Sequence, residues 1–241
     1  MSQELTILQL YPLELNVYGD NGNLLALTRR LEWRDIAVNV LRHNIGDDFN
    51  NYEPDIIIAG GGQDSNQIKI GDDLERLSAK LQQWIEGGAP CLMICGAYQL
   101  LGKPYQNNNN ATIPGLGLID FTTRPGKERL VGNLVLESEE FGKIVGYENH
   151  SGRTYLGDNL RPLGKVIKGD GNNGRDGYEG LRYKNLIGTY CHGPVLPKNP
   201  RMADWLIARA LERKYGSADT MTSLDNSTEL AAQNQSAERP R

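Results

Sequence analysis

The segment that decides the fold is PCLMICGAYQ, residues 90–99. It begins with the apolar run Cys91–Ile94, which is typical of a strand buried on both faces, and it passes into a helical pattern. Between the two stand Cys95 and the small residues Gly96 and Ala97. A side chain on such a sharp strand-to-helix turn projects outward, and the helix N-terminus favours a thiolate over a thiol. The segment therefore predicts that Cys95 is a nucleophile on an α/β scaffold.

The remainder of the chain supports this scaffold. Strands alternate with helices in the first half, which predicts right-handed crossovers and a parallel sheet covered on both faces. From residue 117 onward, glycine turns separate short β-rich segments without convincing helices. We therefore expect an α/β three-layer sandwich with a mostly parallel central sheet and a C-terminal antiparallel extension. The predicted parallel strands are 5–10, 36–40, 55–59, 91–95 and 186–190, the helices are 24–31, 72–85 and 200–215, and the antiparallel segments are 117–123, 130–136, 144–147 and 163–168.

The last part of the chain differs from the rest in composition. Residues 216–241 are rich in Ser, Thr, Asn, Gln and charged residues and poor in aromatic ones. Such a segment has too little apolar surface to bury, so we expect it to be a disordered tail. Residues 1–215 are expected to form one domain.

Composition argues against several classes of function. The net charge is -4, and basic residues are interspersed with acidic ones, so no nucleic-acid-binding surface is indicated. The three cysteines give neither a disulfide framework nor a zinc-binding spacing, so we expect a reduced, cytoplasmic protein without a metal site. No run approaches the roughly 18 apolar residues of a membrane span. Gly60–Gly62 lacks the lysine of a nucleotide-binding P-loop.

A nucleophilic cysteine needs a base, and His192 is the candidate. It follows the predicted strand 186–190 in the segment GTYCHGP, residues 188–194. A lone histidine at a strand end is more often structural, but the strands of a parallel sheet end at one edge, where His192 can meet Cys95. The glycine run Gly60–Gly62 follows another strand at the same edge. Its backbone N–H groups can approach a ligand oxygen and form an oxyanion hole.

Four motifs together resemble a known family. They are YGDNGN (18–23), AGGGQD (59–64), GYENHSGRT (146–154) and GTYCHGP (188–194). With the cysteine turn, they are similar to class I, or triad-type, glutamine amidotransferase domains. Within this class they resemble the cobyric-acid-synthase-like (CobB/CobQ-like) branch and its GatD type, the glutaminase subunits of lipid II isoglutaminyl synthase. The resemblance spans residues 5–215 and leaves the tail outside.

The resemblance implies hydrolysis of L-glutamine through a thioester. Cys95 would attack the side-chain amide carbon, and the N–H groups of Gly61 and Gly96 would hold the oxyanion. His192 would protonate the leaving ammonia and then activate the water that hydrolyses the thioester. The family's substrate-binding arginine matches Arg129, which would bind the glutamine α-carboxylate; from composition alone it is a surface charge.

Gln99, four residues after the cysteine, either faces the substrate or packs inside its helix. The resemblance also implies a heterodimer, in which ammonia passes to a Mur-ligase-like partner subunit. That partner would use ATP, with no cofactor in this chain, to activate the D-glutamate carboxylate of the membrane-bound lipid II. The product would be D-isoglutamine in peptidoglycan synthesis.

The histidine motif departs from the broader class in its acid. Triad amidotransferases commonly place a glutamate two residues after the histidine, and this chain has Pro194 there. Either His192 works in a dyad, or an acid comes from Asp20, from Glu148 or from the partner. We favour the partner, because its carboxylate would couple glutaminase activity to complex formation.

Two other interpretations remain open. A related subunit would serve another acceptor, such as a cobyrinic acid derivative, although the lack of an ATP-binding domain in this chain weakens that interpretation. A DJ-1-like stress or chaperone protein, or an inactive amidotransferase-like binding module, would keep the cysteine turn without hydrolysing glutamine. Alkylation of Cys95 by a glutamine-like diazo ketone and release of ammonia separate these classes.

Overall fold

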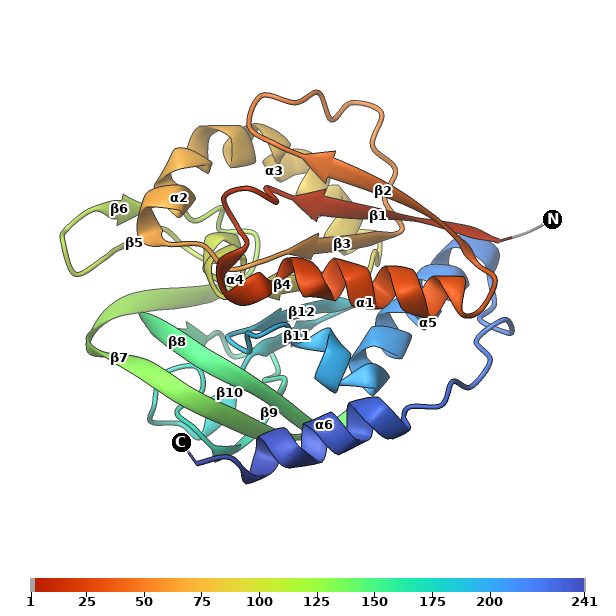
Figure 1. Cartoon of the computed structure of the whole chain (residues 1–241). Helices are drawn as coiled ribbons and strands as arrows, with labels where there is room; N and C mark the ends of the chain where they lie inside the picture. The colour runs from red at the N-terminus through yellow and green to blue at the C-terminus, as the bar shows by residue number, and fades with distance from the viewer. Residues whose placement is uncertain (1–2, 241) are drawn as a thin grey trace.

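The computed structural model describes residues 3–240 and centres on a six-stranded sheet of order β11-β12-β4-β3-β1-β2 (Figure 1). All neighbouring pairs are parallel except β11 with β12. The elements of this layer system are β1 (Glu4–Leu10), α1 (Asn21–Glu32), β2 (Ala37–His43), β3 (Ile56–Ala59), α2 (Asp64–Lys69), α3 (Gly71–Glu86), β4 (Cys91–Ile94), α4 (Gly96–Leu101), β11 (Leu181–Tyr183), β12 (Leu186–Thr189) and α5 (Pro200–Tyr215).

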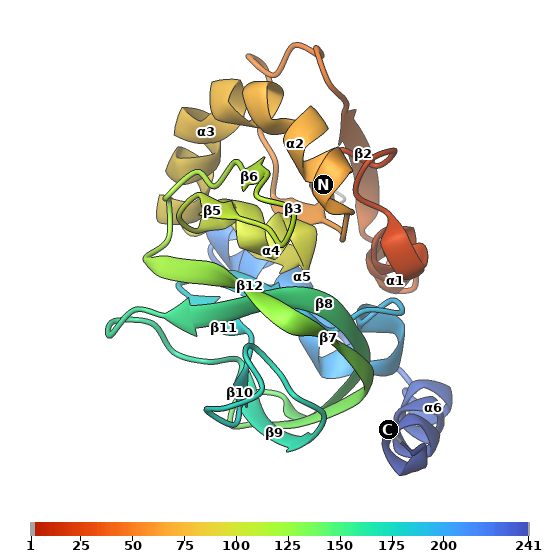
Figure 2. The ribbon, with the colours of Figure 1, turned by 90° about the vertical axis from the view of Figure 1, so that its left-hand side faces the viewer.

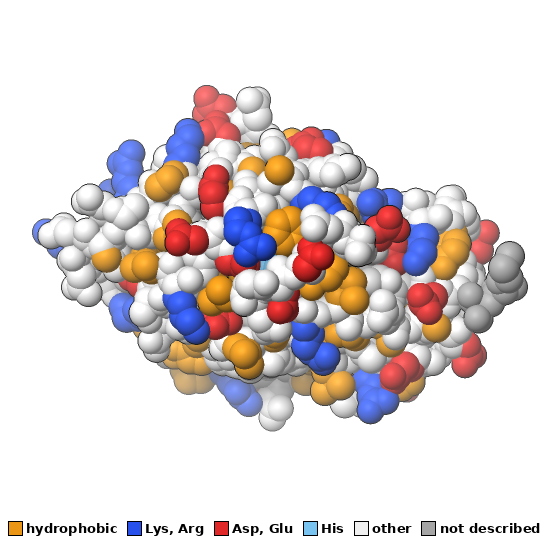
Figure 3. Space-filling view, turned by 90° about the horizontal axis from the view of Figure 1, so that it is seen from above, with side chains coloured by type: hydrophobic (Ala, Val, Ile, Leu, Met, Phe, Trp, Pro, Cys, Tyr) orange, Lys and Arg blue, Asp and Glu red, His pale blue; other side chains and the backbone are white. Residues whose placement is uncertain are grey.

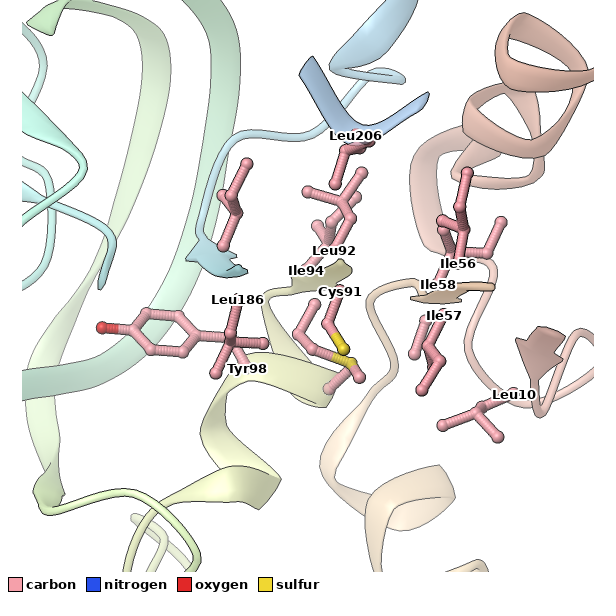
Figure 4. Close-up of a cluster of buried hydrophobic side chains, with 14 of the residues drawn as sticks. Leu10, Ile56, Ile57, Ile58, Cys91, Leu92, Ile94, Tyr98, Leu186 and Leu206 are labelled. Atoms are coloured by element: carbon pink, nitrogen blue, oxygen red, sulfur yellow. The ribbon is translucent and has the colours of Figure 1, made fainter. Parts of the chain in front are cut away.

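Burial explains why these segments become strands and helices. Every residue of β3 and β4 is buried, as the continuous apolar runs predict for central strands of a parallel sheet. Helices α1 and α5 pack against each other on one face, and α2, α3 and α4 lie on the other (Figure 2). Leu27 and Leu31 of α1 and Leu77 of α3 are fully buried, because their helical spacing places them toward the sheet. Figure 4 shows the resulting core, in which Leu92 and Ile94 lie between Leu206 and Tyr98.

The antiparallel strands form a sheet of their own. Its order is β10-β9-β7-β8, and most of it is the long hairpin of β7 (Phe121–Ser138) and β8 (Gly142–Leu156); β9 (Gly164–Lys168) and β10 (Tyr178–Glu179) complete it. The α/β class with a mostly parallel central sheet is confirmed, but only β11 extends that sheet in an antiparallel sense. The two sheets meet where Tyr147 of β8 pairs with His192, immediately after β12.

The C-terminal segment differs from the expected disordered tail. Residues Ser227–Glu238 form helix α6, which lies along β7, β8 and the 3-10 helix η2 (Leu196–Lys198) (Figures 1 and 2). Polar contacts hold it: Arg30 pairs with Glu229 at 3.5 Å, and Gln233 donates to Asn199 Oδ1 at 3.1 Å. Composition indicates only that this segment has few apolar residues to bury. It does not reveal which hydrogen-bonding groups elsewhere in the chain can hold the segment in place.

The remaining elements are short. A 3-10 helix η1 (Val17–Gly19) precedes α1, and the hairpin of β5 (Tyr105–Gln106) and β6 (Thr112–Ile113) leads toward β7. On the face in Figure 3, acidic and basic side chains are interspersed, in keeping with the sequence. Among the described residues, no helix has the length and apolar character needed to cross a membrane, and no group of His, Cys, Asp and Glu is placed to hold a metal ion.

Candidate active site

Four loops meet at the carboxyl edge of the central sheet and enclose a pocket of about 500 Å³. They follow β1, β3, β4 and β12, because parallel strands bring the segments after them to one edge. The pocket is lined by Cys95, His192, Gln99 and Arg129 together with residues of the glycine loop and of β8. Four candidate residues from three distant segments of the sequence thus line one cavity.

Cys95 has the backbone of a strained turn. Its φ and ψ are 49° and -100°, in a region that residues with a side chain rarely adopt. Two hydrogen bonds hold the turn, since the Cys95 N–H donates to Thr189 O at 2.8 Å and its carbonyl accepts from Gln99 N at 2.9 Å. Gly96 must be small, because a methyl group there would lie 2.9 Å from Gly62 N. The predicted strand-to-helix elbow is present, with Cys95 on the pocket wall.

His192 is held rigidly beside this cysteine. Its N–H donates to Tyr147 O at 2.8 Å and its carbonyl accepts from Tyr147 N at 3.2 Å, so β8 fixes the backbone. The side chain is 1% exposed. Burial lowers the pKa of His192, but the negative charge of the Cys95 sulfur and the contact with Asp20 outweigh it and raise the pKa to about 10. The histidine therefore carries a proton at neutral pH and can act as a general acid.

The acid that orients His192 comes from this chain. Asp20 Oδ2 lies 3.2 Å from His192 Nδ1, which leaves Nε2 for the pocket side. Glu148, another candidate, accepts from Asp170 N at 2.7 Å and Gly171 N at 2.9 Å and serves that loop instead. The carboxylate beside His192 Nδ1 is therefore Asp20, and our preference for a carboxylate of the partner was wrong. Asp20 ends the loop after β1, and only the tertiary structure brings it to the histidine.

The glycine loop contributes differently from the prediction. The Gly61 N–H donates to Asp20 Oδ2 at 2.7 Å, so it is not the oxyanion donor that we expected. Gly61 is needed for space: a methyl group there would overlap His192 Cε1 and lie 3.3 Å from both Asp20 Oδ2 and Cys95 Cβ. Within residues 3–240, the N–H groups of Gly62 and Gly96 donate to no acceptor, and the two glycines are close, since a methyl group on Gly96 would lie 2.9 Å from Gly62 N.

A chain of buried side chains supports the glycine loop from behind. Gln67 Nε2 donates to Gly62 O and to Gln99 Oε1, both at 3.2 Å. Gln99 Nε2 in turn donates to the Tyr190 hydroxyl at 3.1 Å, and this oxygen lies 2.6 Å from Thr154 Oγ1. Gln99 lines the pocket, but both ends of its amide are used inside the protein. Sequence reasoning missed Gln67 and Tyr190, because no motif spacing connects them.

Arg129 reaches the pocket from β7. Its Nε donates to Asn149 Oδ1 at 2.8 Å and its Nη2 to Asn149 O at 3.2 Å. Among the described residues, Nη1 has no partner, which leaves the end of the guanidinium available for a carboxylate.

The other histidines and cysteines make packing or hydrogen-bonding contacts inside the protein, although His150 also lines the pocket. His150 is buried, its Nδ1 lies 2.8 Å from Gly152 O, and burial lowers its pKa, so it stays neutral. His43 bonds to Asp73 at 2.8 Å, away from the pocket lining. Cys91 and Cys191 are fully buried, and burial raises the pKa of each thiol, as expected for packing residues.

Comparison with known proteins identifies the family of this chain. The model of the CobB/CobQ-like glutamine amidotransferase domain matches residues 6–200. The chain belongs to this family. It is 44% identical over 229 residues to the GatD subunit of the glutamine-hydrolysing lipid II isoglutaminyl synthase of Staphylococcus aureus (strain N315). This alignment covers 95% of this chain and 93% of that protein. The corresponding GatD subunit of Streptococcus pneumoniae (strain ATCC BAA-255 / R6) is 40% identical over 215 residues, with 88% and 83% covered.

A solved structure shares the fold. The crystal structure of a glutamine amidotransferase superposes with a TM-score of 0.58, at 17% identity, over 84% of this chain and 98% of that one. The family resemblance inferred from the four motifs is therefore confirmed, and so is the fold class.

Proposed function

We propose that this chain hydrolyses L-glutamine through a Cys95 thioester. The Cys95 thiolate attacks the side-chain amide carbon and forms a tetrahedral oxyanion. The carbon–nitrogen bond then breaks as His192 gives its proton to the nitrogen, which leaves as ammonia. Water adds to the thioester, gives a proton to His192, and releases glutamate and the thiolate. The single observation that carries this mechanism is the convergence of Cys95, His192 and Asp20 around Gly61.

The oxyanion is stabilised by main-chain amides. The candidate donors are the unpaired N–H groups of Gly62 and Gly96, since a methyl group on Gly96 would lie 2.9 Å from Gly62 N, and Gln67 holds the Gly62 peptide by its carbonyl. Loss of one such donor typically lowers the rate by roughly 100-fold to 1000-fold. In this assignment, Gly62 replaces Gly61 as the oxyanion donor of the loop. Gly61 instead leaves the space that the His192 imidazole occupies.

Substrate recognition is assigned to Arg129. Its unused guanidinium end would pair with the α-carboxylate of glutamine, and Asn149 holds the other edge. Gln99 lies at the pocket wall, where it orients Gln67 and Tyr190 rather than offering a free amide.

The ammonia would serve a second subunit. The GatD relatives are subunits of lipid II isoglutaminyl synthases. The alignments with this chain cover 93% and 83% of their lengths. We propose a Mur-ligase-like partner that binds ATP and amidates the D-glutamate carboxylate of lipid II to D-isoglutamine, with no cofactor bound by this chain. A cytoplasmic location fits both the acceptor's synthesis and the free thiols.

The test combines alkylation with capture of the partner. A diazo ketone analogue of glutamine should label Cys95 in the wild-type chain, and ammonia release should disappear in Cys95→Ala. Affinity purification of the tagged chain from its native cells should recover a Mur-ligase-like protein. Unlabelled Cys95 together with absent ammonia release would refute the glutaminase assignment. Recovery of a different ligase would keep it and replace the acceptor.

A further inference from the structure

A tyrosine covers the histidine of the proposed active site. Tyr18 lies on η1, and its ring meets the His192 ring edge-on with 5.1 Å between centroids. It also packs at 6.0 Å against the ring of Tyr147, the residue that clamps the His192 backbone. Tyr18 is 45% exposed whereas His192 is 1% exposed. The tyrosine therefore forms the outer wall between the imidazole and solvent.

One side-chain amide connects this wall to Arg129. Asn149 Nδ2 donates to the Tyr18 hydroxyl, and Asn149 Oδ1 accepts from Arg129 Nε at 2.8 Å. Because the two ends of an amide differ in donor and acceptor character, these contacts together fix its orientation. The Asn149 carbonyl adds a bond from Arg129 Nη2 at 3.2 Å. Loss of the Tyr18 hydroxyl would therefore loosen the group that aims the guanidinium.

The backbone at Tyr18 is unusual for a surface residue. Its φ and ψ are 59° and 24°, the left-handed region that bulky side chains seldom occupy. Such strain persists only where surrounding contacts hold it, and Tyr18 has ring contacts to His192 and Tyr147 and a hydroxyl contact to Asn149. Phenylalanine or alanine at this position bears a similar backbone cost, so these variants test the side chain alone.

We propose that Tyr18 is a positioning residue for glutamine hydrolysis. Its hydroxyl, through Asn149, aims Arg129 at the substrate α-carboxylate, and its ring shields His192 and Cys95 from solvent. This inference rests on the proposed function, in which Arg129 binds glutamine and Cys95 attacks it. Tyr18 thus contributes both to selection of a substrate with an α-carboxylate and to exclusion of water during thioester formation.

The experiment compares Tyr18→Phe, Tyr18→Ala and wild type as full chains with the co-purified partner. Glutamine hydrolysis gives kcat and KM, and Cys95 alkylation is timed with two reagents. The diazo ketone analogue carries the α-carboxylate of glutamine, whereas iodoacetamide does not. Tyr178→Phe is the control, because Tyr178 of β10 is similarly exposed, at 46%, and lies outside the pocket.

Tyr18→Phe should raise KM and slow the diazo ketone by roughly twofold to tenfold, the usual effect of one lost hydrogen bond, with kcat and the iodoacetamide rate within about twofold. Tyr18→Ala should slow the diazo ketone further and speed iodoacetamide by about threefold or more, because access to the thiol increases. Tyr178→Phe should match the wild type.

Two results would overturn the inference. An unchanged KM in Tyr18→Phe would remove the connection to Arg129. A parallel fall of both alkylation rates in Tyr18→Ala would mean that the ring only supports the fold. Failure of the proposed function is distinguishable, because it would appear in the wild-type chain as absent hydrolysis and absent diazo ketone labelling.

Discussion

Replacement of Gly61 by alanine tests the geometry of the site most directly. The added methyl group would overlap His192 Cε1, and the ring must move by about 1 Å to restore the ordinary contact distance of 3.4 Å. The Nδ1 of His192 is already 3.2 Å from Asp20 Oδ2, and a shift of that size is enough to break this hydrogen bond. The backbone of His192 cannot move with the ring, because both its N–H and its carbonyl are hydrogen-bonded to Tyr147.

Misplacement of a catalytic group by about 1 Å can lower a rate by roughly 100-fold, and we expect a fall of this order in kcat for Gly61→Ala. Overpacking should also cost about 1–3 kcal/mol of unfolding free energy. The control is Gly216→Ala, since Gly216 ends α5 with φ of 78° and open space around its Cα. It should cost about 1 kcal/mol in stability without changing kcat.

The assay is steady-state ammonia release at saturating glutamine, together with urea unfolding of both variants. If Gly61→Ala retained more than about a tenth of the wild-type kcat, the argument that a crowded imidazole position controls the reaction would be refuted. A fall in kcat in both variants would instead trace the loss to general destabilisation.

Three further predictions follow from buried groups. The contact with Asp20 helps to raise the pKa of His192 to about 10, so Asp20→Asn should lower the pH at which the imidazole titrates by NMR. The same variant should lower kcat by about 100-fold or more. An unchanged titration midpoint would contradict the role of Asp20. Burial raises the pKa of Glu179 from 4.5 to about 8, so the folded state keeps a proton that the unfolded state loses, and stability should fall between these pH values by at most about 5 kcal/mol. Urea unfolding at pH 5 and pH 9 should show a clearly larger fall in the wild type than in Glu179→Gln, and equal falls would contradict the assignment to Glu179. Finally, Cys95→Gly should be about 1–2 kcal/mol more stable than Cys95→Ala, since glycine relieves the strained turn, while neither releases ammonia; equal stabilities would show that the turn is unstrained.

Much of the fold followed from local patterns. The apolar runs in segments 55–59 and 91–95 predicted central strands, because strands buried on both faces of a parallel sheet have few polar positions. Leu27 and Leu31 gave the buried face of α1 by their spacing. Helix α6 was missed, because its partners Arg30 and Asn199 are far away in the sequence and its own composition is polar.

The site divides in the same way. Cys95 and its small neighbours were recognisable from the sequence, because the chemistry of a nucleophile on a turn is encoded in consecutive residues. His192 was identified by a strand that ends at the same sheet edge as β4, and the register of that sheet placed it there. The function of Gly61 was assigned wrongly, since the sequence shows that glycine leaves room but not what fills it.

By itself, the sequence predicted Cys95 as the nucleophile, a mostly parallel scaffold and the family, since each depends on residue types at short spacing. Only the tertiary structure decided which carboxylate orients His192, which amides remain free for an oxyanion, and that Tyr18 packs on His192. The physical reason is that hydrogen-bond pairing over long separations depends on distances between loops. Those distances are fixed by how the two sheets pack, and no local pattern of residues records them.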